Sequence, residues 1–113
     1  MKNQSIREHV IVASRKLLLF LPHAVRQMSR PERMVTKNEV RQVIDNGEII
    51  EDYPEDARGH SCLIIGYGDN DRPIHIVASP KEDYLAIITV YLPNKQNWEN
   101  DYKTRKKNEM YTL

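Results

Sequence analysis

The chain has 113 residues, of which 40% are hydrophobic and 29% are charged, and its formal net charge is +1. This length supports one domain with a single core, and the composition excludes the disordered class. The only cysteine, Cys62, excludes an intramolecular disulfide and any Cys-x-x-Cys zinc site. The apolar run at residues 17–21 is far shorter than the roughly 20 residues of a membrane span, and no cleavable leader is evident. We therefore expect a cytoplasmic protein with no membrane partner.

Charge is distributed unevenly along the chain. Residues 15–41 contain seven basic side chains and only two acidic ones, whereas acidic residues gather between 48 and 56. A basic region beside an acidic patch suits binding of an anion such as RNA. The alternative interpretation is a solvated helix surface, which carries the same kind of charges.

The first part of the chain predicts two helices. Residues 5–15 show apolar side chains near helical spacing. The apolar run at 17–21 is compatible with either the end of that helix or an edge strand. Pro22 suits the first turn of the next helix, which we expect to end near Ser29. We divide the chain into an N-terminal extension (1–21), a core domain (22–98) and a polar C-terminal tail (99–113).

The second part predicts one further helix followed by strands. Thr36 and Glu39 form a capping box, and the Asn46-Gly47 pair is a helix stop signal. After it the pattern alternates, which predicts strands at 48–53, 60–67, 72–79 and 84–92 joined by short hairpins. We expect an α+β fold in which N-terminal helices pack on a four-stranded antiparallel meander.

The alternation also predicts which side chains share a face of the sheet. In the last strand, residues 86, 88, 90 and 92 are all apolar, so we expect that face to pack on the helices. The opposite face would then bring His75 and Tyr91 together. A slip of one residue in the register would separate them.

A second group of polar side chains lies on the predicted helix that begins at Pro22. His23, Arg26, Gln27 and Arg30 fall on one stripe of that helix. The start of a helix attracts phosphate and lowers the pKa of a nearby histidine. This stripe is therefore a candidate anion site.

An ordered series of motifs resembles the bacterial family called domain of unknown function 4258. The series covers roughly residues 22–98 and consists of His23-Ala24 with Gln27-Met28, Pro31-Glu32-Arg33-Met34-Val35 before Glu39-Val40, Gly47-Glu48-Ile49-Ile50-Glu51-Asp52-Tyr53-Pro54, Ser61-Cys62-Leu63 with Gly66, Arg72-Pro73-Ile74-His75-Ile76-Val77, and Ile87-Ile88-Thr89-Val90-Tyr91-Leu92-Pro93 with Trp98. Each motif alone is weak, whereas six in this order are specific. Many family members have arginine at the position of Gln27.

The resemblance implies more than the residues do by themselves. The family is similar to the RelE- and MqsR-like ribonucleases of toxin–antitoxin pairs, which implies a RelE-like fold, RNA as the substrate and a small zinc-finger antitoxin of the MqsA kind as partner. These are analogies of fold and gene neighbourhood, and a fold does not settle a function.

Three side chains are candidates for proton transfer and substrate orientation. His23 and His75 suit general acid–base work because an imidazole titrates near neutral pH. Tyr91 could bind a phosphate or stack on a base. The alternatives are a helix-start histidine bonded to backbone for His23, a satisfied half-buried histidine for His75, and cross-strand packing for Tyr91.

Several further residues are candidates for binding the substrate. Guanidinium groups are permanently charged and can bind phosphate with two hydrogen bonds, although exposed arginines are usually only solvated. The candidate set is Arg26, Gln27, Arg30, Arg33, Arg72 and Thr89. His60 and Cys62 have no third ligand at a recognisable spacing, so we expect no metal and no cofactor.

The sequence thus favours a metal-independent endoribonuclease that cleaves single-stranded RNA. In this hypothesis His23 and His75 share proton transfer, Arg26 and Arg33 stabilise the phosphorane charge, and Tyr91 orients the substrate. The alternative is a non-catalytic interaction module, for example a toxin that has lost its activity.

Overall fold

The computed structural model describes residues 6–107, and its elements follow the expected order. The helices are α1 (Ile6–Lys16), α2 (Pro22–Met28) and α3 (Lys37–Asn46), with a short 3-10 helix, η1 (Asp69–Asp71); the strands are β1 (Leu18–Phe20), β2 (Glu48–Tyr53), β3 (Ser61–Tyr67), β4 (Pro73–Pro80) and β5 (Leu85–Tyr91). The α+β class is confirmed. Most predicted boundaries lie within one residue of those observed.

The sheet has five strands and is mixed, so the expected four-stranded antiparallel meander is incomplete. Its order is β1-β5-β4-β3-β2, and β1 runs parallel to β5 while all other pairs are antiparallel. The apolar run at 17–21, which the sequence left open, supplies the extra strand. The Leu85 N–H donates to the Leu17 carbonyl, and the Leu21 N–H donates to the Ile87 carbonyl.

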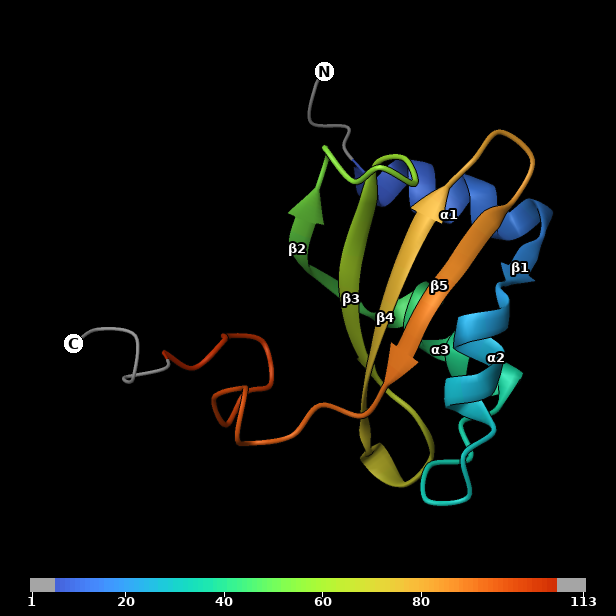
Figure 1. Cartoon of the computed structure of the whole chain (residues 1–113). Helices are drawn as coiled ribbons and strands as arrows, with labels where there is room; N and C mark the ends of the chain where they lie inside the picture. Colours follow the sequence, from blue (N-terminus) through green and yellow to red (C-terminus); the bar gives the residue numbers. More distant parts are fainter. Residues whose placement is uncertain (1–5, 108–113) are drawn as a thin grey trace.

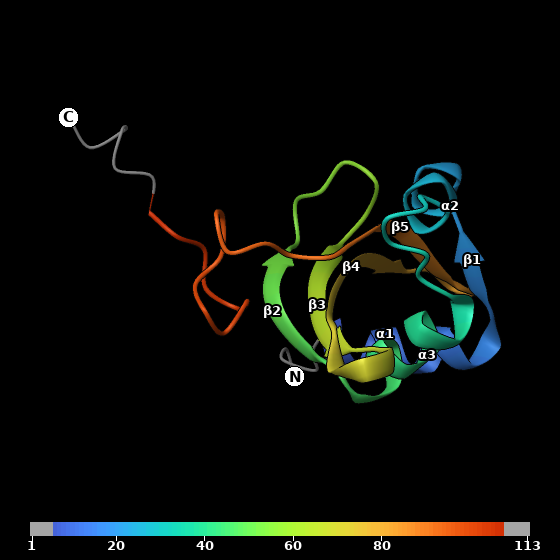
Figure 2. The same cartoon turned by 90° about the horizontal axis from the view of Figure 1, so that it is seen from below.

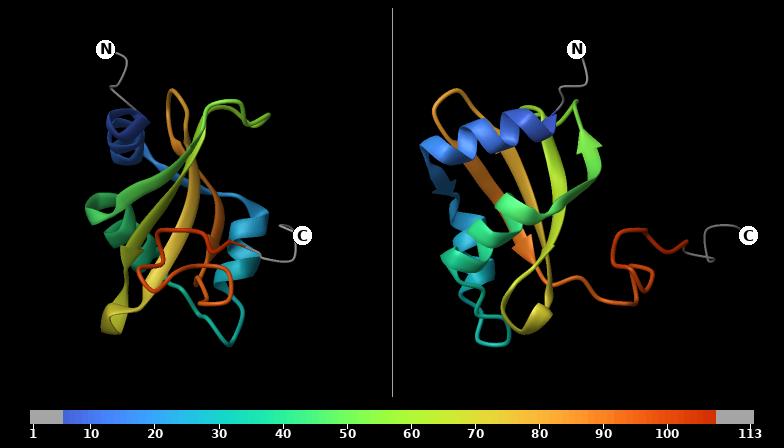
Figure 3. Two further views of the ribbon diagram at one scale, coloured as in Figure 1. Left: turned by 90° about the vertical axis from the view of Figure 1, so that its left-hand side faces the viewer. Right: turned by 180° about the vertical axis from the view of Figure 1, so that it is seen from behind.

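Helices cover one side of the sheet. α1 packs on β4 and β5, α3 packs on β3 and β4, and α2 lies alongside β5 beyond the last residue of β1. Figure 1 shows the sheet in front of α1 and α3, and the right view of Figure 3 shows these two helices in front of it. Figure 2 shows that the strands curve, with the chain that follows β5 on the side away from α1 and α3. The sheet therefore offers its other face to this last segment.

Helix α3 forms where the sequence places it because local and tertiary signals agree. The Thr36 hydroxyl accepts the Glu39 N–H, and the Glu39 carboxylate accepts the Thr36 N–H, so the predicted capping box is confirmed. The buried face of α3 approaches β3 closely at Gly66. A Cβ atom there would lie 2.9 Å from the Val43 Cα, so only glycine allows this helix to pack at the observed distance.

A β-bulge in β5 changes which side chains face the helices. Val77 pairs with Thr89 but the next residue of β4, Ala78, pairs with Ile87, so β5 contains one extra residue at this point. Ile87 and Val90 both belong to the core on the helix side. The expectation that residues 86, 88, 90 and 92 form one helix-facing row is therefore wrong for the first half of the strand, because the bulge reverses the alternation.

The segment after β5 packs back onto the sheet. We call residues 93–107 the C-terminal strap. Trp98 and Arg105 form an isolated antiparallel bridge, and the Trp98 side chain is buried. The left view of Figure 3 shows the strap on the opposite side of the sheet from α1. The expected polar tail is thus partly structure, and its residues 108–113 lie outside the described residues.

Within residues 6–107, none of the helices has both the length and the apolar character that crossing a membrane requires.

Candidate functional site

His75 lies at the centre of the sheet face that the strap covers. Its side chain is fully buried, and both ring nitrogens have partners. Nδ1 lies 3.0 Å from the Tyr91 hydroxyl, and Nε2 lies 2.8 Å from the Tyr102 carbonyl oxygen. A carbonyl can only accept a hydrogen bond, so Nε2 carries the proton of the neutral ring and Nδ1 accepts from the Tyr91 hydroxyl.

Aromatic rings enclose this imidazole on two sides. The Trp98 ring meets it edge to face with 4.5 Å between ring centroids, and the Tyr91 ring does so at 5.1 Å. Burial lowers the pKa of His75 more than the Tyr102 carbonyl and the nearby Glu51 carboxylate raise it. His75 is therefore neutral at pH 7, in the state that can take up a proton.

An ion pair fastens the strap to β2 beside His75. Arg105 donates from Nε and Nη2 to the two carboxylate oxygens of Glu51, at 2.8 and 3.0 Å. The same guanidinium lies over the Trp98 ring, 4.7 Å from its centroid. The hydrogen bond from Arg105 lowers the pKa of Glu51 despite partial burial. Tyr53 donates a further hydrogen bond to Glu51. We call the Arg105–Glu51 pair the clasp.

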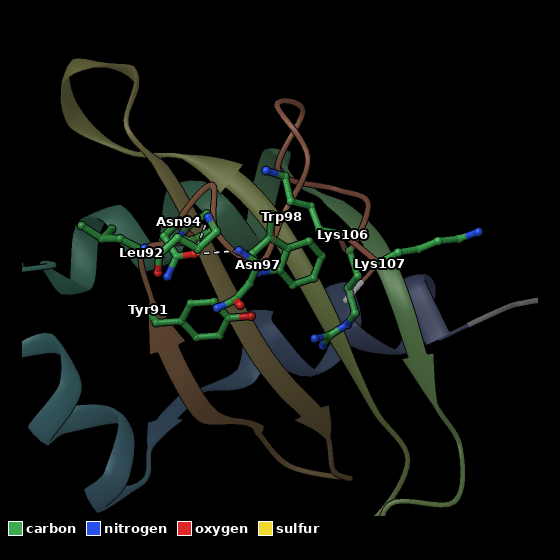
Figure 4. Close-up of a pocket in the computed structure, with 10 residues that line it drawn as sticks. Tyr91, Leu92, Asn94, Asn97, Trp98, Lys106 and Lys107 are labelled. Carbon is green, nitrogen blue, oxygen red and sulfur yellow. Dashed lines mark hydrogen bonds between the residues drawn. The ribbon is translucent and has the colours of Figure 1, made fainter. Parts of the chain in front are cut away.

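A polar pocket of about 520 Å³ opens where β5 passes into the strap. Its wall is built by residues 91–94, 96–98 and 105–107. Figure 4 shows the Tyr91 ring pointing towards Trp98, while Lys106 and Lys107 extend from the strap. Two lysines and one arginine on a wall without acidic residues favour an anionic ligand.

The pocket gives Tyr91 a defined chemistry. The Tyr91 hydroxyl donates its hydrogen to His75, so the lone pairs of its oxygen can accept a hydrogen bond from a bound molecule. Burial raises the pKa of Tyr91, which keeps the group a phenol at neutral pH. The arrangement can pass a proton from a ligand hydroxyl through Tyr91 to His75.

Arg72 is occupied by structural contacts rather than free for phosphate. It donates to both carboxylate oxygens of Glu39, at 2.9 and 3.2 Å, and to the carbonyls of Arg33 and Met34. Glu39 is buried and also accepts the Asp69 N–H. These contacts join the start of α3 to the β3–β4 connection, so the role of Arg72 is structural.

The stripe on α2 is separate in its contacts from the His75–Tyr91 pair. His23 and Arg26 are exposed, and Arg30 makes a long ion pair with Glu32 at 3.8 Å. Among residues 6–107, neither His23 nor Arg26 forms a hydrogen bond or ring contact with His75 or Tyr91. The predicted convergence of the two histidines has no support in these contacts.

Gln27 has a backbone partner that the sequence did not reveal. Its Oε1 accepts the Val90 N–H at 2.8 Å. β1 pairs with β5 only as far as Ile87, and Gln27 satisfies a donor beyond that point. Thr89 is half-buried and lies opposite Val77 in the sheet, and the Arg33 carbonyl is used by Arg72. The contacts of Gln27 and of the Arg33 backbone are therefore structural.

The sequence reasoning brought His75 and Tyr91 together but missed the strap. Trp98, Tyr102 and Arg105 all contact the pair or its clasp. Trp98 is the last residue of the expected core domain, whereas Tyr102 and Arg105 come from the expected polar tail. The sequence signal for this contact was the single tryptophan of the chain, which is rarely left in water. In the part of the chain that the structure describes, no three histidine, cysteine or acidic side chains gather in a way that could hold a metal ion.

Residues 20–92 match the family model described as Domain of unknown function (DUF4258). The chain belongs to this family. The match contains the hydrogen-bonded His75–Tyr91 pair and ends before the strap begins, so the strap lies outside the family region. No curated protein matches the chain, and neither does any solved structure. The description of the family assigns it no activity.

Proposed function

We propose that the protein is a toxin-like, metal-independent endoribonuclease that cleaves single-stranded RNA in the pocket beside Tyr91. The observation that carries this proposal is the Tyr91–His75 hydrogen bond of 3.0 Å at the wall of a pocket with three cationic side chains. A neutral acceptor behind a phenol supplies proton transfer, and the cations suit the charge of a phosphodiester. The RelE-like fold and the toxin class come from the resemblance of the sequence motifs.

The reaction follows from the direction of these hydrogen bonds. The ribose 2′-hydroxyl gives its proton to the Tyr91 oxygen while the phenol proton passes to His75 Nδ1. The 2′ oxygen attacks the adjacent phosphorus, the bond to the 5′ oxygen breaks, and that oxygen takes a proton from solvent. The products are a 2′,3′-cyclic phosphate and a 5′-hydroxyl. His75 is buried, so its imidazolium returns the Nδ1 proton to the Tyr91 oxygen, and the phenol releases a proton to solvent in the pocket.

The cationic wall stabilises the charge that develops on the phosphorane. Lys106 and Lys107 are exposed and extend from the strap, and neither forms an ion pair with another of residues 6–107, so both can approach a phosphate. Fixed positive charge at the reacting phosphate is usually the largest catalytic contribution. No contact among residues 6–107 joins the basic side chains of α2 and of the segment that follows it to the pocket. They remain candidates for binding a part of the RNA strand outside the pocket: His23, Arg26, Arg30 and Arg33.

Cleavage of RNA by the purified full chain tests the proposal. We expect scission of a single-stranded RNA that persists in EDTA, and a loss of roughly 100-fold or more in Tyr91→Phe, since the phenol can no longer relay a proton. Tyr67→Phe is the matched control, because Tyr67 is exposed and lies outside the pocket. Absence of cleavage by the wild type, or equal rates in Tyr91→Phe, would refute the catalytic proposal.

The toxin context has its own test. If the chain is a toxin, its expression slows growth, and co-expression of a zinc-finger antitoxin of the MqsA kind restores it. His75→Ala should relieve the growth defect while the protein still accumulates. Persistent growth arrest in that variant would remove His75 from the mechanism.

A second function is favoured by one observation, the complete burial of His75. A sealed histidine is also what a rigid, non-catalytic RNA-binding pocket would contain. In that case Lys106→Ala and Lys107→Ala weaken binding of single-stranded RNA and reduce its salt dependence, while the wild type leaves the RNA intact.

A further inference from the structure

We propose that the strap is a positioning element of the site: the Tyr102 carbonyl, held in place by the clasp, selects the tautomer of His75 that lets Tyr91 accept a proton from the substrate. This inference deepens the proposed function and rests on it for its catalytic consequence. The effect on the tautomer itself does not depend on catalysis.

The two hydrogen-bond partners of His75 differ in chemistry. Tyr102 offers only a carbonyl oxygen to Nε2, whereas the Tyr91 hydroxyl can either donate to Nδ1 or accept from it. The strap is therefore the contact that decides between the two tautomers. The tyrosine follows that decision because its hydroxyl hydrogen can rotate.

The tautomer of His75 determines what Tyr91 can do. With the proton on Nε2, the phenol hydrogen points at His75 and the phenol oxygen is free to accept a proton from a ligand. With the proton on Nδ1, His75 donates to the phenol oxygen and the phenol hydrogen is directed away from the imidazole. His75 then cannot take up a proton at Nδ1, and the relay is blocked.

Several contacts hold the strap in place beside His75. A tight turn places the Tyr102 carbonyl: Asp101 accepts the N–H groups of Lys103 and Thr104, and Tyr102 adopts a φ of 59°. The clasp joins the end of this turn to β2 with two short charge-assisted hydrogen bonds. The buried Trp98 ring contacts both the Arg105 guanidinium and the His75 ring.

Two carboxylates of β2 pair with the strap, and they differ in what they hold. Glu51 pairs with Arg105 beside His75, whereas Glu48 forms an exposed ion pair of 2.8 Å with Lys103. Around His75 the charged and titratable groups are Tyr91 of β5, Glu51 of β2 and Arg105 of the strap. Glu51 does not line the pocket, so its removal breaks the clasp without removing a cation from the pocket wall.

The decisive experiment compares Glu51→Ala with the matched control Glu48→Ala in the full chain. Two-bond ¹⁵N correlation spectra of the histidine rings report which nitrogen of His75 is protonated. We expect the wild type and Glu48→Ala to show the proton on Nε2 alone, and Glu51→Ala to show a mixture of tautomers. Far-UV circular dichroism confirms that each variant is folded.

The cleavage rate of Glu51→Ala is a second readout. A rise or a fall in this rate distinguishes a role of Arg105 as a cation from a role of the clasp in positioning the strap. If Arg105 matters only as a pocket cation, Glu51→Ala releases it from its partner, and cleavage or RNA affinity rises. If the clasp positions the strap, the cleavage rate falls by at least about 10-fold. Proton transfer by a positioned side chain contributes roughly 100-fold or more, and a misaligned relay loses part of that contribution. Glu51→Gln keeps an acceptor for Arg105 and should recover part of the rate.

The outcomes of the two readouts are distinguishable. A proton on Nδ1 in the wild type, or an unchanged Nε2 tautomer in Glu51→Ala, overturns the inference whatever the cleavage rates are. An unaltered or faster cleavage rate in Glu51→Ala overturns the positioning role. If the wild type cleaves no RNA, the proposed function fails, while the spectra still decide whether the strap selects the tautomer.

Discussion

Replacing Glu39 by glutamine should be among the most destabilising single changes in this chain. The Glu39 carboxylate is 1% exposed and accepts hydrogen bonds from the N–H groups of Thr36 and Asp69 and from two nitrogens of Arg72. It therefore caps α3, anchors the start of η1 and balances a guanidinium at once. A glutamine amide can replace one oxygen but presents an NH₂ group to donors that need an acceptor.

The size of the stability loss follows from the Arg72 guanidinium, which Glu39→Gln leaves without its charged partner. Removing one side of a buried ion pair costs about 3–5 kcal/mol. The Arg72 side chain is 30% exposed and can recover some hydration, so we take the lower end, about 3 kcal/mol. At roughly 4 °C per kcal/mol for a domain of this length, the Tm should fall by about 12 °C. That loss is a large fraction of the roughly 5–15 kcal/mol expected for the whole domain.

The effect should depend on pH in a defined direction. Burial raises the pKa of Glu39, but the hydrogen bonds from Arg72 and from the backbone of Thr36 and Asp69 outweigh it, so the pKa lies below its ordinary value of 4.5. The folded state thus binds fewer protons than the unfolded state. The stabilisation is complete above the unfolded pKa and is lost as the pH falls through the folded pKa, so the difference between the variant and the wild type should narrow below about pH 4.5.

Urea unfolding followed by Trp98 fluorescence measures this difference directly. Glu32→Gln is the matched control, because Glu32 also pairs with an arginine but is 63% exposed, and its replacement should cost less than about 0.5 kcal/mol. A free energy of unfolding for Glu39→Gln within 1 kcal/mol of the wild type, measured at pH 7, would refute the reasoning.

Three further changes test other parts of the structure. Burial lowers the pKa of His75 from its ordinary value of 6.5, so the unfolded state takes up a proton first as the pH falls. The free energy of unfolding should therefore drop by up to about 1.4 kcal/mol per pH unit below pH 6.5. A His75→Gln variant whose urea titrations keep this same slope would show that His75 is not the group responsible. Gly66→Ala should cost about 1–3 kcal/mol in urea unfolding, because its Cβ would meet Val43 at 2.9 Å, and an unchanged midpoint would show that α3 can move away. Gln27→Leu should cost about 1 kcal/mol and speed hydrogen exchange at the Val90 amide, whereas an amide that stays protected has another partner.

Local signals determined much of the fold. The capping box at Thr36, the helix start at Pro22 and the alternation through β2 to β5 depend on neighbouring residues in the chain, so the sequence was enough to predict them. The adjacency of His75 and Tyr91 also followed from alternation, because hairpin register fixes which residues of adjacent strands lie opposite each other.

Tertiary contacts decided the rest of the site. Whether residues 18–20 form a strand depends on β5, far along the chain, and the bulge in β5 depends on a second pairing with β4. Arg72 became a structural residue because folding places Glu39 beside it, 33 residues away in sequence. The strap has too little hydrophobic sequence to predict a structure by itself; it becomes ordered because the sheet presents Glu51 and His75 to Arg105 and Trp98. Sequence patterns reflect interactions between residues that are close along the chain. The site, in contrast, depends on contacts between residues far apart in the sequence, which bury one another in the folded protein.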